Sequence, residues 1–354
     1  MLRFAVLVLA GAVCGSAADP APVTVKVTTR NMDAGTDLNL VLAATDSASL
    51  NAGLAATLAE VNASGIPARA ARLADEIAAG QPDLVALQEV TLWRTGPLST
   101  EAAGASTVLY DQLDLLMSEL AKRQLHYGIV AIDTLTDAEM PVPPANLNLR
   151  LTDRDVVLAR NDVNQSTLDV YDVETHRYAV SLPLGLVNPA LAGITVYQGF
   201  ILATVNAGGN VFRFADTHLA SLIPGVQLLT AAQLAEAAEL LKNLGAGGTP
   251  VLLAGDFNAN AEPGPDDSGT VELIRKARFT DVWKALHPND PGFTWPLFGE
   301  DQSAGKPTQP YERIDLIFTR GLTPLAVEQV GKGFFGGAYA SDHVGVVATV
   351  QAGK

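Results

Sequence analysis

Acidic, amide and histidine side chains stand at the ends of apolar runs along this chain. In the clearest example, Leu252-Leu253-Ala254-Gly255-Asp256-Phe257-Asn258, a run typical of a buried strand ends in an aspartate and an asparagine. Two polar residues at this spacing can point the same way as the chain leaves the sheet. A carboxylate and an amide are costly to bury there unless a polar group lies between them. We therefore predict that Asp256 and Asn258 belong to a polar site.

Other acidic residues in similar positions are suited to binding a cation. Glu89 follows the apolar run 83–87, Asp33 follows the alternating run 23–29, and Asp342 lies close to the C-terminus. Carboxylates without cysteine ligands favour Mg²⁺, Mn²⁺ or Ca²⁺ over structural zinc. Because Mg²⁺ usually takes only one or two carboxylates, we predict Glu89 as the main metal ligand, with Asp33 and Asp342 near it.

Two histidines and an arginine add groups that move protons or bind anions. His343 is titratable near neutral pH. Asp315 lies within an apolar run and needs a partner, so pairing with His343 would hold the imidazole and favour its charged form. His218 supplies a second imidazole, and Arg154 supplies a fixed positive charge. These side chains are suited to binding a phosphodiester and stabilising a leaving oxygen.

Two asparagines complete the set of polar groups. The amides of Asn31 and Asn258 can bond phosphate oxygens or orient a water without adding repulsion. No serine or cysteine stands in a setting recognisable as that of a nucleophile. We therefore expect direct attack by water, assisted by a general base and a metal ion.

Each of these residues also has a purely structural explanation. The alternatives are a turn for Asp256 and Asn258, a helix cap or surface strand end for Glu89, an ion pair for Arg154, a core contact for His218 and a pair with Arg313 for Asp315. Trp283 and Trp295 are expected in the core rather than in a ligand platform. Because so many polar clusters occur together in one chain, we favour the functional interpretation.

The first residues predict export. A positively charged start, the apolar stretch 4–13 and the small residues 16–18 are typical of a secretory signal peptide over residues 1–18. Lipid anchoring at Cys14 is the alternative, although the residue before it is larger than such sites favour. Cleavage would remove the only cysteine. The mature domain, 19–354, is therefore expected to be secreted or periplasmic and free of disulfides.

Composition limits how the protein can meet an anionic substrate. The 354 residues carry a formal net charge of −15 and only 23 lysines and arginines. Such a protein does not bind phosphate polymers by bulk charge. An anionic substrate must be met through local cations, most simply a bound metal.

Strands are predicted before the polar clusters, with helices between some of them. Expected strands cover 23–29, 83–87, 126–132, 155–160, 211–215, 250–254, 313–318 and 344–350, with further antiparallel strands within 161–210. Expected helices cover 68–79, 108–122 and 224–244, after a partly helical insertion at about 34–65. Residues 91–105 are expected to form a loop, and residues 134–149 a surface excursion. No linker divides the chain, so we predict one α/β domain of two packed sheets with helices outside.

This ordered set of clusters resembles the endonuclease/exonuclease/phosphatase superfamily, the DNase I-like metal-dependent phosphoesterases. The resemblance runs from about residue 23 to residue 350. It is carried by Asn31 and Asp33 in Thr29-Arg30-Asn31-Met32-Asp33, Glu89 in Leu87-Gln88-Glu89-Val90, His218 in Thr217-His218-Leu219, Asp256 and Asn258 in Gly255-Asp256-Phe257-Asn258, Asp315 in Arg313-Ile314-Asp315, and Asp342-His343 after Ser341. The insertion at 34–65 directly after the first motif is a departure.

The resemblance implies a four-layer α/β sandwich of two mixed β-sheets flanked by helices, with the site at one end of the sheets. It implies that Glu89 is the main Mg²⁺ ligand and that Asn31 lies beside the metal and the phosphate. It also implies that Asp256, helped by Asn258, aligns or deprotonates water.

The same resemblance assigns the basic residues. It implies that His343, oriented by Asp315, lies against the scissile phosphate. His218 is similar to the histidine of DNase and sphingomyelinase members that contacts the phosphate or protonates the leaving group. Arg154-Asp155 looks like the Arg-Glu pair of secreted DNases, which is a looser match.

The leading hypothesis is an exported metal-dependent phosphodiesterase that hydrolyses nucleic acid or a small phosphodiester. The alternative is a sphingomyelinase-like phospholipid phosphodiesterase, for which Phe293 to Phe298 and Phe334-Phe335 are candidate apolar contacts. A non-catalytic binding protein on the same fold is a hypothesis of a different class. We expect a monomer without a stable protein partner.

Overall fold

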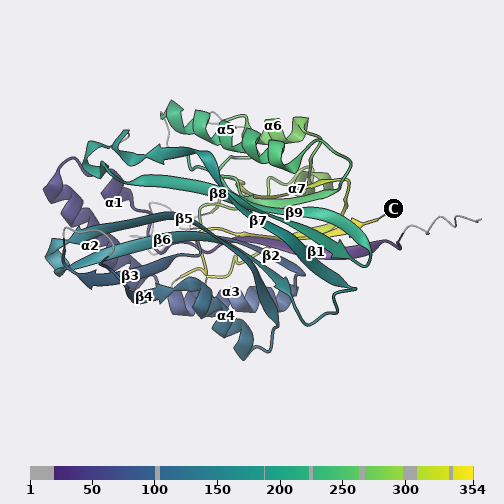
Figure 1. The fold of residues 1–354 in the computed structure, drawn as a ribbon, viewed down its shortest axis with the longest axis horizontal. Coiled ribbons are helices and arrows are strands. Elements are labelled where there is room, and N and C mark those ends of the chain that lie inside the picture. The colour runs from purple at the N-terminus through teal and green to yellow at the C-terminus, as the bar shows by residue number, and fades with distance from the viewer. Residues whose placement is uncertain are drawn as a thin grey trace, which may run out of the picture.

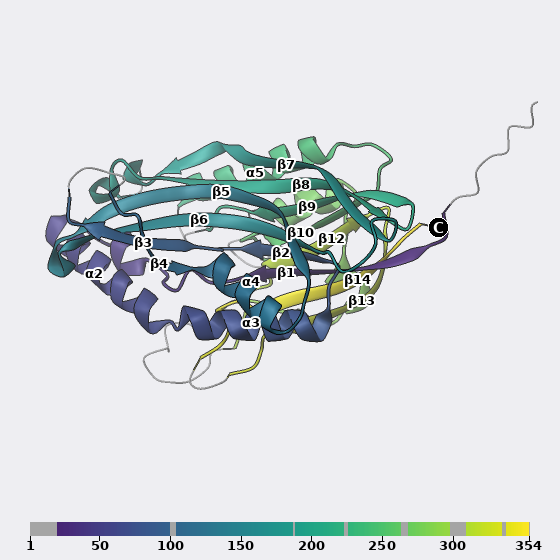
Figure 2. The ribbon, with the colours of Figure 1, turned by 60° about the horizontal axis from the view of Figure 1, so that its bottom comes forward.

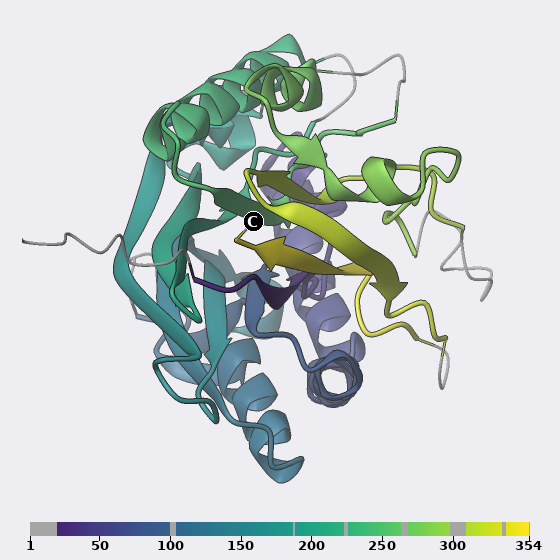
Figure 3. The ribbon, with the colours of Figure 1, turned by 90° about the vertical axis from the view of Figure 1, so that its right-hand side faces the viewer.

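Two mixed β-sheets of eight and six strands pack face to face in the computed structural model, with helices on both outer sides (Figure 1). The structure describes residues 20–99, 104–186, 188–222, 226–262, 268–297, 309–334 and 338–353. Figure 3 shows the helix, sheet, sheet and helix layers from the end where the strand β1 begins. The predicted four-layer α/β sandwich is confirmed. The predicted signal peptide, residues 1–18, lies outside the described residues.

The eight-stranded sheet contains both ends of the chain. Its order is β13 (Thr323–Val330), β14 (Gly345–Ala352), β1 (Val23–Asn31), β2 (Leu84–Gln88), β6 (Leu147–Arg160), β3 (Leu92–Pro97) and β4 (Thr107–Asp111), with β5 (Tyr127–Val142) paired along β6. The six-stranded sheet has the order β11 (Thr280–Asp281), β12 (Asp315–Arg320), β10 (Val251–Asp256), β9 (Asn210–His218), β8 (Thr195–Ala207) and β7 (Leu168–Pro183).

The strands that carry the polar clusters are neighbours near the centre of each sheet. β1 runs parallel to β2, and Asn31 pairs with Gln88. β10 runs parallel to β9, and Asp256 pairs with His218. β12 runs antiparallel to β10, so its first residue, Asp315, also lies opposite Asp256. Strand order and register therefore bring these clusters to one edge of the sandwich.

The core between the sheets holds these strands in place. Val25 and Val27 of β1 face the other sheet, where Phe214 of β9 and Leu252 of β10 are fully buried. Burying one such side chain contributes roughly 1.5–3 kcal/mol. The register of the central strands is therefore fixed by apolar side chains that are buried between the two sheets.

Within the described residues, four helices cover the outer faces of the sheets. Apolar residues of α3 (Ile66–Gly80) and α4 (Gln112–Lys122) pack on the eight-stranded sheet. Those of α5 (Gln227–Leu244) and α6 (Thr270–Lys276) pack on the six-stranded sheet. The short α7 (Val282–Leu286) follows β11. The predicted start of the third long helix at 224 lies outside the described residues, and α5 begins at Gln227.

The insertion after β1 is partly helical, as predicted. It contains α1 (Asn39–Leu42) and α2 (Ser47–Ala63), and Asp46 caps α2 by accepting from the Ser49 backbone N–H. Apolar residues of the insertion pack against the far ends of β5 and β6 in a separate cluster. Figure 2 shows α2 and α3 following one another along the outside of the molecule. No described helix is both long and apolar enough to span a bilayer.

Two predicted irregular segments are strands instead. Residues 92–97 of the expected loop form β3, which pairs with β6. Most of the expected excursion at 134–149 belongs to a long hairpin of β5 and β6, joined by the 3₁₀ turn η1 (Pro143–Ala145). Pro141 is tolerated because β5 is an edge strand. The helix expected from residue 108 begins at Gln112, because residues 107–111 form β4.

A second 3₁₀ segment follows β7. Here η2 (Leu184–Leu186) precedes the turn predicted at Asn188-Pro189, and η3 (Pro189–Leu191) begins within that turn. The Asn188 side chain donates hydrogen bonds to the carbonyl oxygens of Leu42 and Ala44. The end of β7 is thereby tied to the insertion.

Candidate active site

Asn31, the last residue of β1, joins the two sheets at the site. Its Nδ2 donates to Glu89 Oε1 at 2.9 Å and to Asp256 Oδ2 at 3.0 Å. The side chain is fully buried, and its Oδ1 accepts from the Asp33 backbone N–H at 2.8 Å. One amide therefore holds a carboxylate from each sheet at a fixed separation.

Carboxylates predicted to bind a metal gather beside Asn31. Glu89 Oε2 accepts from the Ala34 backbone N–H at 2.8 Å, so the first residue of the insertion orients this carboxylate. Asp33 Oδ1 accepts from Gly35 N–H at 2.6 Å, and Asp33 Oδ2 lies 3.3 Å from Arg69 Nη2. Asp33 and Glu89 both have positive φ angles, 59° and 54°, which turn the chain sharply at the strand ends.

The local charge fits a hard divalent cation. Burial raises the pKa of Asp33, and the neighbouring Asp342 raises it further while Arg69 lowers it. Burial and the charge of Glu89 likewise raise the pKa of Asp342, opposed by His343 and Arg69. Like charges at close range are unfavourable without a cation. Glu89, Asp342 and Asn31 supply the oxygen donors that Mg²⁺, Mn²⁺ and Ca²⁺ prefer. Both carboxylate oxygens of Asp33 and of Glu89, and the amide oxygen of Asn31, also contact protein donors, and the roles of these residues as metal ligands stay predictions.

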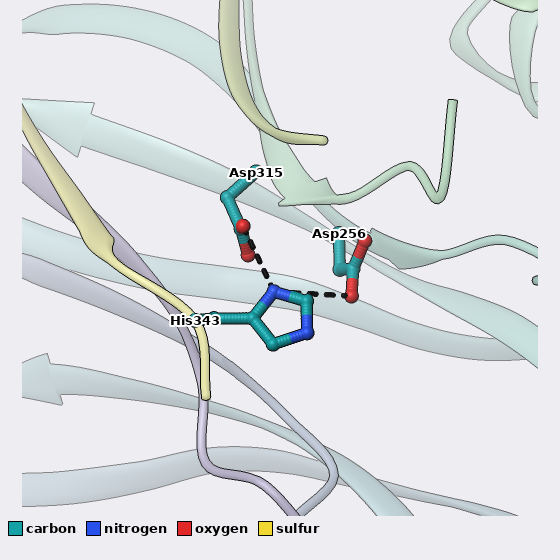
Figure 4. Close-up of side chains that lie close together, drawn as sticks. All are labelled: Asp256, Asp315 and His343. Carbon is teal, nitrogen blue, oxygen red and sulfur yellow. Dashed lines mark hydrogen bonds and ion pairs between the residues drawn. The ribbon is translucent and has the colours of Figure 1, made fainter. Parts of the chain in front are cut away.

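A second acidic group surrounds His343. Figure 4 shows its imidazole lying between Asp315 and Asp256. His343 Nδ1 is 2.9 Å from Asp315 Oδ2 and 3.8 Å from Asp256 Oδ2. These three residues offer ligand atoms within 4.8 Å of one another, but the short Nδ1 contact with Asp315 is that of an ion pair. The predicted pairing of Asp315 with His343 is present in the structure.

His343 is held in its charged form. Burial alone would lower the pKa of the imidazole, but the carboxylates of Asp315, Asp342 and Asp256 outweigh burial and raise it to about 10. Burial also raises the pKa of Asp256, a shift that His343 opposes and Asp315 reinforces. At neutral pH His343 is therefore a cation suited to a phosphate oxygen, next to a carboxylate of increased basicity.

His218 lies on the other side of Asp256. Its Nε2 is 3.8 Å from Asp256 Oδ2, and its Nδ1 is 3.6 Å from Asp155 Oδ1. Burial would lower the pKa of His218, but the nearby carboxylate of Asp155, with the charges of Asp256 and Asp153, raises it well above the usual value. A charged imidazole supported from behind by a buried carboxylate is able to donate a proton.

Asn258 borders the same group. Its backbone N–H donates to Asp256 Oδ1 at 2.9 Å, and its Nδ2 donates to the Leu219 carbonyl at 2.9 Å. Its φ of 46° is stabilised by Gln233, whose Nε2 donates to the Asn258 carbonyl oxygen at 2.8 Å. The backbone of Asn258 thus helps to orient Asp256, whereas its side-chain amide is bonded to Leu219, and the predicted help of that amide with water or phosphate stays a prediction.

Arg154 is placed differently from the prediction. Its guanidinium donates to Asp111 Oδ1 at 2.6 Å and to the Val90 carbonyl oxygen at 2.8 Å. Asp111 is also the N-cap of α4. Arg154 is buried and already paired, so the geometry supports the structural alternative of an ion pair rather than a phosphate contact.

Several supporting residues had no assigned role in the sequence. Trp295, expected in the core, is only partly buried and donates from Nε1 to Asp342 Oδ2 at 3.3 Å. Gln88 donates to Asp216 Oδ1 at 2.7 Å, another hydrogen bond between the sheets. Ser341 Oγ donates to the Asn31 carbonyl oxygen at 2.8 Å. Gln88 and Ser341 lie inside recognised motifs, which was the available signal, whereas the contact of Trp295 depends on the fold.

Solved structures show the same fold at low identity. A protein of Beutenbergia cavernae described as an endonuclease/exonuclease/phosphatase is 22% identical, with a TM-score of 0.57, over 93% of this chain and 72% of that chain. One from Bacteroides vulgatus is 17% identical, with a TM-score of 0.56, over 94% and 100%. D. rerio TDP2, solved with a single-strand DNA product, is 18% identical, with a TM-score of 0.54, over 92% and 98%.

The solved structures show only the fold, whereas a match of the sequence to a family model shows the family. No curated protein matches the chain. The model of the Endonuclease/Exonuclease/phosphatase family matches residues 48–343, which include all of the site residues described above except Asn31, Asp33 and the backbones of Ala34 and Gly35. The chain belongs to the Endonuclease/Exonuclease/phosphatase family.

Proposed function

We propose that this protein is an exported, divalent-metal-dependent phosphodiesterase that cleaves its substrate by direct attack of water. Members of its family are hydrolases that act on phosphoester bonds. The observation that carries the proposal is the Asn31 amide, which bonds both Glu89 and Asp256. Because one amide bonds both carboxylates, Glu89 can serve as the metal-binding group and Asp256 as the base of the same site.

The chain's own groups divide the reaction between them. Asp256 accepts a hydrogen bond from the attacking water and takes its proton, since burial makes this carboxylate more basic. His343 binds a non-bridging phosphate oxygen as a cation, oriented by Asp315. His218 donates a proton to the leaving oxygen. A divalent cation held by Glu89 would stabilise the charge that develops on the phosphate.

Nucleic acid or a small phosphodiester is the proposed substrate. The related fold of D. rerio TDP2 was solved with a single-strand DNA product, which motivates including DNA among the substrates tested. Export of residues 19–354 and a monomeric state are part of the same proposal. Of the apolar contacts suggested for a phospholipid, Phe334 is 40% exposed and packs on Tyr339, with their ring centroids 5.0 Å apart. Phe298 and Phe335 lie outside the described residues.

Hydrolysis of bis(p-nitrophenyl) phosphate with Mg²⁺, with and without EDTA, tests the chemistry. We expect turnover that EDTA abolishes and that His343→Gln reduces strongly. His287→Gln is the matched control, because this histidine lies away from the site, with Nε2 3.2 Å from the Val327 carbonyl oxygen. Absence of turnover by the folded protein on this ester, DNA, RNA and sphingomyelin would refute the proposal, and activity on sphingomyelin alone would favour the phospholipid alternative.

A further inference from the structure

Arg69 of α3 connects the first and last motifs of the site. Its Nη2 donates to the Met32 carbonyl oxygen and, at 2.6 Å, to the Asp33 carbonyl oxygen. Its Nε donates to the Ala340 carbonyl oxygen at 3.0 Å, immediately before Ser341. The residue is only 4% exposed. One guanidinium therefore binds two segments that are more than three hundred residues apart in the chain.

The segments that Arg69 joins carry the predicted metal ligands. Asp33 follows Asn31 at the end of β1, and Asp342 lies two residues after Ala340. Arg69 Nη2 also lies 3.3 Å from Asp33 Oδ2. The charge of Arg69 lowers the pKa of both Asp33 and Asp342, against the larger effect of burial. Arg69 thus offsets part of the negative charge on these two loops while fixing their separation.

A lysine in this place would keep the charge but not the geometry. The planar guanidinium presents several donors in fixed directions, whereas an ammonium is a single point charge on a flexible stem. Because Arg69 uses Nε toward one loop and Nη2 toward the other, its two contacts depend on the fork itself. Replacing Arg69 with lysine therefore distinguishes a role in positioning the two loops from a role that needs only the positive charge.

We propose that Arg69 is a positioning residue that sets the distance between the Asn31–Asp33 loop and the Ser341–His343 loop, and thereby the affinity of the site for its divalent cation. The inference rests on the proposed function, since it assigns Arg69 to the same metal site. Partners that orient metal ligands from behind typically contribute roughly 10–100-fold to metal affinity or activity. Because Arg69 is buried and bonds backbone carbonyl oxygens of the two loops, its proposed role is positioning rather than catalysis.

Mn²⁺ binding followed by electron paramagnetic resonance tests this role without relying on turnover. We expect Arg69→Lys to weaken Mn²⁺ binding by about tenfold or more. The matched control is Arg123→Lys. Arg123 also ties α3 to its surroundings, through Asp75, Glu119 and the Ala71 carbonyl oxygen, but on the outer surface of the molecule. This control is expected to bind Mn²⁺ as the wild type does.

The melting temperatures of the variants distinguish a loss of loop positioning from a general loss of stability. Weaker Mn²⁺ binding by Arg69→Lys, with a melting temperature no lower than that of Arg123→Lys, supports the inference. Wild-type affinity in Arg69→Lys would show that only the charge matters and would overturn it. Arg69→Gln is the second variant, expected to lose at least as much affinity because its amide reaches only one loop.

Three further outcomes decide between the role of Arg69 and the proposed function. Failure of both Arg69 variants to fold, while Arg123→Lys folds, would make Arg69 a structural residue and overturn the inference. A wild-type protein that binds Mn²⁺ but hydrolyses no phosphodiester would refute the proposed function and leave the Arg69 result valid. A wild-type protein that binds no Mn²⁺ would overturn both.

Discussion

Glu236 of α5 is a buried carboxyl group behind His218, and replacing it with glutamine should stabilise the protein at alkaline pH. Its Oε2 accepts from the Ala220 backbone N–H at 2.8 Å, and the residue is 2% exposed. Burial raises the pKa of Glu236 from its usual 4.5 to about 7, against the favourable charge of His218. The glutamine amide keeps an oxygen for the Ala220 N–H but carries no charge to bury.

The expected gain follows from the two pKa values. A carboxyl group whose pKa is higher in the folded protein binds its proton more tightly there, so its contribution to stability is full below pH 4.5 and is lost as the pH rises to about 7. At about 1.36 kcal/mol per pH unit, the loss is about 3 kcal/mol at pH 8. Glu236→Gln should therefore raise the free energy of unfolding by up to about 3 kcal/mol at pH 8 and by under about 1 kcal/mol at pH 5.

Urea unfolding of both proteins at pH 5 and pH 8, followed by circular dichroism, measures this difference. The signature is a gain at pH 8 that shrinks at pH 5. A gain of equal size at both pH values would show that the effect is not ionisation. A loss of stability at pH 8 would mean that the charged carboxylate is favourable where it lies, and the reasoning from burial would be wrong.

Three further predictions concern the site and the core. Asp256→Asn should abolish turnover with little loss of metal affinity, whereas Glu89→Gln should mainly lower the metal affinity. If calorimetric titration shows the larger loss of metal affinity in Asp256→Asn, the two roles are exchanged. The pKa of His343 is raised to about 10, so this imidazole should stay charged up to about that pH. Turnover that depends on its positive charge should persist over the same range. Asp315→Asn should move the alkaline limb of the pH–rate profile to lower pH, and an unmoved limb would contradict this assignment. Leu252→Ala, in the fully buried core between the sheets, should lower the free energy of unfolding by about 2–5 kcal/mol, and a loss under about 1 kcal/mol in urea unfolding would count against the described packing.

Local pattern was enough to find most of the residues that the fold brings together. Asp256 follows an apolar run whose burial is evident from composition alone, and the same holds for Glu89 and His218. The carboxyl ends of neighbouring parallel strands meet at one edge of a sheet, so residues in these positions converge whatever the loops do. The Asp315 and His343 contact was likewise predictable, since a buried carboxylate needs a partner.

Pairing between distant segments was not visible in the same way. Residues 92–97 and 134–142 form strands because β6 lies beside them, although their own sequences include proline and many polar residues. A strand draws much of its stability from its neighbours across the sheet. Local composition therefore favoured loops in both places, and that prediction was wrong.

For the two arginines, the sequence alone determined the charge and only the tertiary structure decided its use. Arg154 stands next to a core strand, as a phosphate ligand would, but the fold places Asp111 against it and satisfies it. Arg69 looks like any polar residue of an amphipathic helix, yet the packing of α3 brings it between two site loops. The reason is physical: a strand end predicts which backbone edge a side chain occupies, whereas the partner of a long flexible cation depends on which distant segment packs within its reach.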